Sequence, residues 1–217
     1  MNMSLSRCTL GRLLLLFIVA TAPAGLAAVH DPVASARLER ILAPLASLSA
    51  DFSQTVVDGE GFELQSLEGT MVVARPGKVY WQTRPPLEQL VVSDATTLWL
   101  FDKDLEQVTV RPFSEDIANT PAVLLIGKVD KLDETYQVSA LIEDKLETFT
   151  LVPRDESALY QKITLTFSGD APAGMSLWDS LGQQTIIEFR EVVVNGRINQ
   201  RLFKFKIPKG VDVLYDS

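Results

Sequence analysis

The stretch Lys162-Ile163-Thr164-Leu165-Thr166-Phe167 alternates apolar and polar side chains with a period of two. Successive side chains of a β-strand point to opposite faces, so this stretch predicts a strand with one buried and one wet face. Similar alternation occurs at 67–73, 187–190 and 203–207. Counted this way, the chain holds about ten strands. Such one-sided strands are typical of an antiparallel sheet.

Turn residues separate these strands, at Asp58-Gly59, Ser93-Asp94, Gly169-Asp170, Asp179 to Gly182 and Asn195-Gly196. The last pair is a strong hairpin signal. No linker or repeat divides the chain, and after the N-terminal region no helical stretch is long enough to cross between parallel strands. We therefore expect one mainly β (α+β) domain.

The N-terminus has the pattern of a secretory signal peptide. Arg7 and Arg12 precede the apolar run Leu13–Ala20, and small residues follow up to Ala28. Residues 1–28 are therefore predicted to be removed, leaving a mature domain of 29–217. The single cysteine, Cys8, leaves with them, and the net charge of −8 becomes −10 because two arginines are lost. Such acidity argues against nucleic-acid binding.

The mature chain is expected to begin with a helix. Asp31 can cap it and Pro32 suits its first position. Leucine and isoleucine recur at helical spacing from Leu38 to Leu45. Pro44 should end or kink this helix near Ala43.

Two further segments are apolar. Residues 119–127 offer an asparagine cap, a first-turn proline, an apolar run and a closing glycine, which together predict a short helix. Because this helix has no polar face, it must be covered, either as the plug of a barrel or as a lid over a cavity. Residues 98–101 are apolar on both faces, as in a central strand or in a strand that lines a cavity.

Residues for catalysis are scarce. The single histidine, His30, stands at the predicted mature terminus, and the sequence has no HExxH, GxSxG, CxxC or phosphate-binding glycine loop. The acidic stretch Asp102 to Glu106 lies where two strands should turn, and acidic residues are common in turns. We expect no enzyme activity, no metal and no cofactor.

An ordered set of short motifs runs along the mature chain. It begins with Asp51-Phe52-Ser53-Gln54 and Asp58-Gly59, and continues with Ala74 to Trp81 (ARPGKVYW), Gln89 to Asp94, Thr97 to Trp99, Phe101-Asp102 and Asp104 to Gln107. It ends with Asn119-Thr120-Pro121, Leu151-Val152-Pro153, Phe203-Lys204-Phe205 and Pro208 to Asp212. Each motif alone is weak, but in this order they resemble the LolA family of periplasmic outer-membrane lipoprotein carriers.

The resemblance implies an incomplete antiparallel β-barrel with a helical lid over a hydrophobic cavity. It also implies a monomer in the periplasm of a Gram-negative bacterium, acting as a chaperone. Its cargo would be acylated lipoproteins, supplied by the inner-membrane LolCDE transporter and passed to the outer-membrane receptor LolB.

The same resemblance suggests roles for individual residues. Arg75 would lie under the lid and donate hydrogen bonds to its backbone, whereas the residues alone suggest a surface arginine beside Pro76. The expected cavity residues are Val79, Trp81, Trp99, Leu124 and Leu125. The expected lid helix also includes Pro121, Ala122, Val123 and Ile126.

The chain departs from the family pattern at a few positions. Asp94-Ala95 replaces a common Asp-Gly, which leaves a different turn type open. Val79 replaces a frequent aromatic and Ala122 a larger apolar residue, and both changes would reshape the cavity. A LolA-like carrier of another lipid or hydrophobic product is an alternative. A receptor of the LolB type would need a cysteine directly after the signal peptide, where Ala27-Ala28-Val29 offers none. A hydrolase would have His30 as its only possible catalytic histidine.

Overall fold

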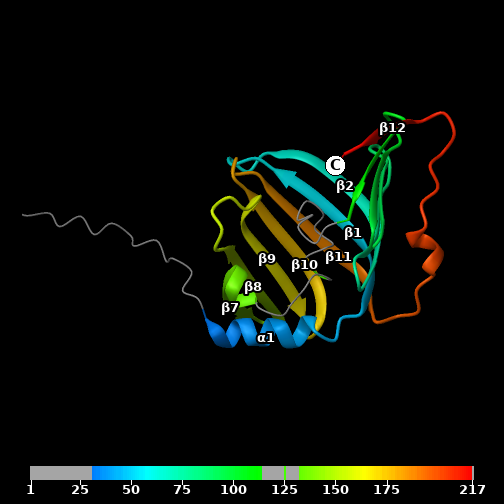
Figure 1. The fold of residues 1–217 in the computed structure, drawn as a ribbon. Coiled ribbons are helices and arrows are strands. Elements are labelled where there is room, and N and C mark those ends of the chain that lie inside the picture. Colours follow the sequence, from blue (N-terminus) through cyan, green and yellow to red (C-terminus); the bar gives the residue numbers. More distant parts are fainter. Residues whose placement is uncertain (1–30, 114–124, 126–131, 217) are drawn as a thin grey trace, which may run out of the picture.

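Twelve strands of the described residues form one continuous sheet in the computed structural model, which describes residues 31–113, 125 and 132–216. The strand order is β12-β6-β5-β4-β3-β2-β1-β11-β10-β9-β8-β7. All neighbours pair antiparallel except β12 and β6, which are parallel. The sheet curves strongly, so that its two halves face each other across a concave side (Figure 1).

The strands have the following bounds. They are β1 (Ser47–Val57), β2 (Glu63–Ala74), β3 (Lys78–Thr83), β4 (Gln89–Asp94), β5 (Thr97–Asp102), β6 (Gln107–Pro112), β7 (Tyr136–Glu143), β8 (Leu146–Pro153), β9 (Tyr160–Ser168), β10 (Ala171–Asp179), β11 (Gln184–Val194) and β12 (Asp212–Tyr215). The antiparallel sheet and the predicted alternation are confirmed, with Ile163, Leu165 and Phe167 all buried.

Helix α1 (Pro32–Leu42) lies across one end of strands β7 to β10 (Figure 1). As predicted, Asp31 caps it by accepting a hydrogen bond from the Val33 N–H at 2.8 Å, and it ends just before Ala43. Ion pairs from Arg37 to Glu147 and Asp170 connect it to the start of β8 and to the turn between β9 and β10. Its apolar face joins the main core, so this helix closes one end of the concave side.

Short helical segments complete the described fold. Helix α3 (Leu132–Thr135) directly precedes β7, and the 3-10 helix η1 (Gln200–Phe203) follows β11. The Ser35 hydroxyl donates to the Asp133 carboxylate at 2.6 Å, which links α1 to α3. No helix of the described residues is both long and apolar enough to cross a membrane.

Two sequence predictions differ from the structure. The alternation at 203–207 predicts a strand, but Phe203 ends η1 and residues 204–207 continue outside the sheet. The Phe205 ring packs on the convex side against Trp99 and Phe101, each at 6.0 Å between ring centroids. This segment therefore alternates because its phenylalanines cover a second apolar surface.

The Asn195-Gly196 hairpin is also absent. Asn195 does adopt a left-handed backbone with φ of 55°, but no strand follows it directly. Its side-chain oxygen accepts hydrogen bonds from the backbone N–H groups of Ala46 and Ser47, and its amide donates to the Pro44 carbonyl at 2.9 Å. The asparagine therefore ties the end of β11 to the link between α1 and β1.

Candidate functional site

The floor of the concave side is apolar where β1, β2 and β3 meet. Phe52 and Trp81 lie with their ring centroids 4.0 Å apart. Val79 is fully buried and Trp81 is 6% exposed. Val79 pairs with Val73, and Trp81 pairs with Met71, so alternate residues of these strands build one face. The structure thus brings two of the expected cavity residues, Val79 and Trp81, together on this floor.

Trp99 lies on the opposite face of the sheet. In the pairing of β4 with β5, Val91 stands opposite Leu100, and Val91 itself pairs with Trp81. Leu100 therefore shares the concave face with Trp81, whereas Trp99 points to the convex side and packs against Phe205. Trp99 therefore does not share a face with Val79 and Trp81, because neighbouring residues of a strand point to opposite faces of the sheet.

Arg75 lies beside the end of α1. Its Nη1 donates to the carbonyl of Ala43, the residue that caps α1, at 3.2 Å. Its Nε and Nη2 are buried, and neither finds a hydrogen-bond partner among the described residues. Burial lowers the pKa of Arg75 from its usual value. The described acceptor of this guanidinium is thus a carbonyl at a helix C-terminus, a position that favours a cation.

The expected lid helix lies mostly outside the described residues. Pro121, Ala122, Val123, Leu124 and Ile126 all fall there. Leu125 is described: it is helical, 1% exposed and part of the main core cluster.

A pocket of about 310 Å³ opens on the concave side beside this floor. Its walls come from strands on both halves of the curved sheet. The lining residues are Gln54, Gln65, Leu67, Trp81, Thr83, Gln89, Val91, Leu100, Arg111, Tyr160 and Thr185. The pocket therefore combines apolar side chains with amides, hydroxyls and one guanidinium.

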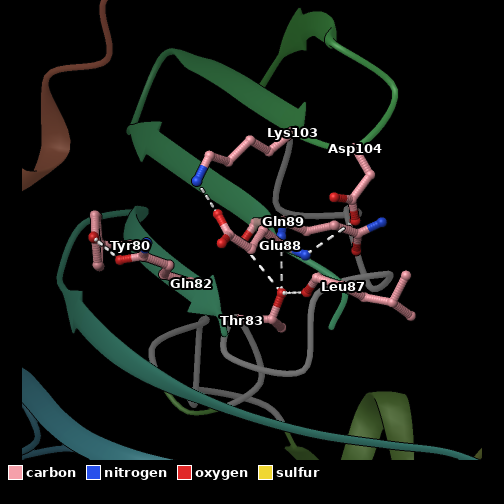
Figure 2. Close-up of polar contacts among 8 residues, drawn as sticks. All are labelled: Tyr80, Gln82, Thr83, Leu87, Glu88, Gln89, Lys103 and Asp104. Carbon is pink, nitrogen blue, oxygen red and sulfur yellow. Dashed lines mark hydrogen bonds and ion pairs between the residues drawn. The ribbon is translucent and has the colours of Figure 1, made fainter. Parts of the chain in front are cut away.

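Figure 2 shows polar contacts around Thr83 and Gln89, which both line this pocket. The Thr83 hydroxyl donates to the Leu87 carbonyl at 2.6 Å and accepts from the Gln89 N–H at 2.9 Å. Glu88 forms an ion pair with Lys103, and the Glu88 N–H donates to Asp104 at 3.3 Å. The Thr83 bonds fix the β3–β4 connection, and the Glu88 contacts fasten it to the turn between β5 and β6.

Several of the residues that line the pocket were not predicted from the sequence. Leu100 was hidden because 98–101 is apolar on both faces, which gives no sign of the inward side. Tyr160 faces the pocket because the β9–β10 pairing shifts between Trp178 and Asp179, and such a bulge re-aims the side chains beyond it. Arg111 could have been noticed only as a charge inside the strand 107–112.

An open, curved and mainly antiparallel sheet with an apolar floor and a pocket on its concave side defines a protein of the incomplete β-barrel class. The described residues contain no group of three or more side chains suited to hold a metal ion.

Comparison with known proteins identifies the family. The family model for the outer membrane lipoprotein carrier protein LolA matches residues 43–206. An outer-membrane lipoprotein carrier protein of Chromohalobacter salexigens is 44% identical, over 83% of this chain and 86% of that protein. One of Pseudomonas fluorescens is 40% identical, over 94% and 98%. The chain belongs to the LolA family.

A solved structure supports the fold. An uncharacterized conserved protein of Thermus thermophilus superposes with a TM-score of 0.53 at 13% identity. The match covers 85% of this chain and 99% of that protein.

Proposed function

We propose that this protein is a periplasmic chaperone that encloses the acyl chains of lipoproteins and carries them to the outer membrane. The observation that carries the proposal is the apolar floor of Phe52, Val79 and Trp81 beside a pocket on the concave side, in a chain of the lipoprotein carrier family. Pockets of roughly 300–1,000 Å³ are usual for small hydrophobic ligands.

The physical need for such a carrier follows from the cost of exposing acyl chains to water. Burial is worth ~0.8 kcal/mol per CH₂, so one chain of about 16 carbons gains on the order of 10 kcal/mol. A lipoprotein cannot cross an aqueous compartment with that surface exposed. A protein that covers the chains without chemistry is sufficient, so we propose no enzymatic step.

The partners belong to the proposal as well. The inner-membrane LolCDE transporter would supply the cargo, and the receptor LolB would accept it. The predicted signal peptide, which lies outside the described residues, supports a periplasmic location.

Arg75 is proposed to help the cavity open and close. One of its donors is bonded to Ala43 at the end of α1, while Nε and Nη2 lack acceptors among the described residues. Those two donors could form hydrogen bonds with backbone carbonyls of the expected lid, residues 119–127. Charge-assisted bonds of this kind are worth roughly 1.5–3 kcal/mol each and would offset part of the acyl gain.

Release of lipoproteins from spheroplasts tests the chaperone function. Leu125→Glu places a charge in the core that faces the acyl chains and should sharply reduce release. Leu141→Glu is the matched control, because Leu141 is 58% exposed on β7. Undiminished release by the Leu125 variant would contradict the assignment, and mass spectrometry of bound lipid would reveal a different cargo.

A second assay tests Arg75. With Arg75→Leu, transfer of a bound lipoprotein to the acceptor should change markedly, whereas Arg40→Leu on the exposed side of α1 should leave it unchanged. A wild-type transfer rate in the Arg75 variant would remove the proposed role.

A further inference from the structure

Arg111 is a cation that faces the pocket and has no anionic partner among the described residues. It pairs with Leu98 on β5, and Leu98 shares the concave face with Leu100. Its Nε is buried and has no hydrogen-bond acceptor in the described part of the chain, where no ion pair to Arg111 occurs either. The pocket lining contains no carboxylate. A buried guanidinium Nε without an acceptor calls for a functional explanation.

Further polar side chains surround the same pocket. Gln54 and Gln65 come from β1 and β2, while Tyr160 and Thr185 come from β9 and β11. No side-chain hydrogen bond of these four residues occurs within the described part of the chain. Burial, helped by the charge of Asp179, raises the pKa of Tyr160, so its hydroxyl keeps its proton at neutral pH. The pocket thus offers several free donors beside one obligatory donor, the guanidinium.

We propose that Arg111 and these donors bind the glyceryl ester group at the head of the acyl chains, an inference that rests on the proposed lipoprotein carrier function. Ester carbonyls accept hydrogen bonds and cannot donate them, so they complement a wall of donors. A single guanidinium among neutral amides and hydroxyls fits an uncharged acceptor group. Phosphate is usually held by more positive charge.

The pocket lies where it could hold the ester group of a lipid while the acyl chains cover the apolar floor. Leu67, Trp81, Val91 and Leu100 also line it, and Trp81 stacks on Phe52 of the apolar floor. A lipid whose ester group reaches Arg111 can therefore lay its hydrocarbon on continuous apolar surface. The polar wall would fix where the head of the lipid sits, while the floor supplies the burial energy.

The test compares two ligands that differ only in the ester carbonyls. One is a synthetic triacylated lipopeptide with a diacylglyceryl cysteine, and the other is its dialkyl ether analogue. Wild-type protein should bind the ester at least about tenfold more tightly, the equivalent of one charge-assisted hydrogen bond. Arg111→Met should lose about that factor for the ester and keep its affinity for the ether.

Matched variants guard against trivial effects. Arg190→Met removes an arginine from the convex face, where Arg190 pairs with Glu68 at 3.0 Å, and should not alter either affinity. Arg111→Lys keeps the charge without the planar fork and should fall between wild type and Arg111→Met. Thermal unfolding of each variant shows whether it is folded.

The outcomes separate the two proposals. Equal loss for ester and ether, or no loss for either, overturns the ester-binding role of Arg111. If Arg111→Met weakens the binding of short-chain phosphatidylglycerol but not of the ester lipopeptide, the pocket is a phosphate site. That result also overturns the ester-binding role of Arg111. If wild-type protein binds neither lipopeptide, the proposed carrier function itself fails.

Discussion

Among the glycines that the structure describes, Gly69 on β2 is the one where an added methyl group would make the shortest contact. A Cβ added there would lie 2.2 Å from the backbone oxygen of Gln82 and 2.4 Å from the ring of Phe52. The first contact is with backbone of the paired strand β3, which cannot rotate away. The second would push Phe52 against Trp81, its neighbour at 4.0 Å. Gly69→Ala must therefore separate two strands or disturb the cavity floor.

We expect Gly69→Ala to lower the free energy of unfolding by about 2–4 kcal/mol, at the upper end of the usual cost of overpacking. For a domain of this size the melting temperature should fall by about 5–15 °C. Thermal unfolding followed by circular dichroism measures this, and binding of an apolar fluorescent probe should weaken with it.

Gly59→Ala is the matched control, because the nearest atom to its added Cβ is 3.6 Å away and Gly59 has no left-handed backbone. This variant should unfold within about 0.5 kcal/mol of wild type. Equal melting temperatures for the Gly69 and Gly59 variants would refute the close packing of Phe52 on β2.

Three further predictions concern the turn at Ala95, the hydrogen bonds of the Asn195 side chain and the half-buried phenol of Tyr160. Ala95 has φ of 82°, so Ala95→Gly should stabilise the protein by about 0.5–1 kcal/mol, and a lower melting temperature would contradict this. Asn195→Ala loses the hydrogen bonds to the link before β1 and should cost about 2–3 kcal/mol in urea unfolding. Asn195→Asp, which keeps the acceptor, should cost less, and the reverse order would be inconsistent with the structure. The pKa of Tyr160 is raised above 10.0, so between that pH and the raised pKa the unfolded chain releases a proton that the folded chain keeps. The free energy of unfolding should therefore fall as the pH rises above about 10, with a smaller fall in Tyr160→Phe; an identical pH dependence would exclude the burial of this phenol.

The fold was largely predictable from local patterns. Alternation at 162–167 and the turns at Gly169-Asp170 and Asp179 to Gly182 indicated the antiparallel sheet, because one-sided burial imposes a period of two. Asp31 and Pro32 indicated the start of α1. The strand prediction at 203–207 was wrong because alternation indicates only that a segment is buried on one side. A segment that packs on the convex face is buried in this way without joining the sheet.

The site was less predictable, because it depends on register and curvature. Nothing local distinguishes Trp99 from Leu100 as the inward residue; the pairing of Val91 with Leu100 decides it. Arg111 and Tyr160 meet at one pocket although β6 and β9 are far apart in the sheet order. Only the curvature of the whole sheet brings them together, and no short motif carries that information.

A carrier that releases its cargo without a nucleotide must not bind too tightly. An entirely apolar cavity would gain on the order of 10 kcal/mol from each long acyl chain, which makes release slow. Here the floor of Phe52 and Trp81 adjoins a wall that contains Arg111, whose buried Nε has no acceptor among the described residues. If the wall binds the ester head as proposed, much of the selectivity comes from hydrogen bonds that water or a receptor can replace. The cavity can then recognise a lipid with a smaller free energy of acyl-chain burial than a fully apolar cavity would give. Transfer to an acceptor therefore remains possible.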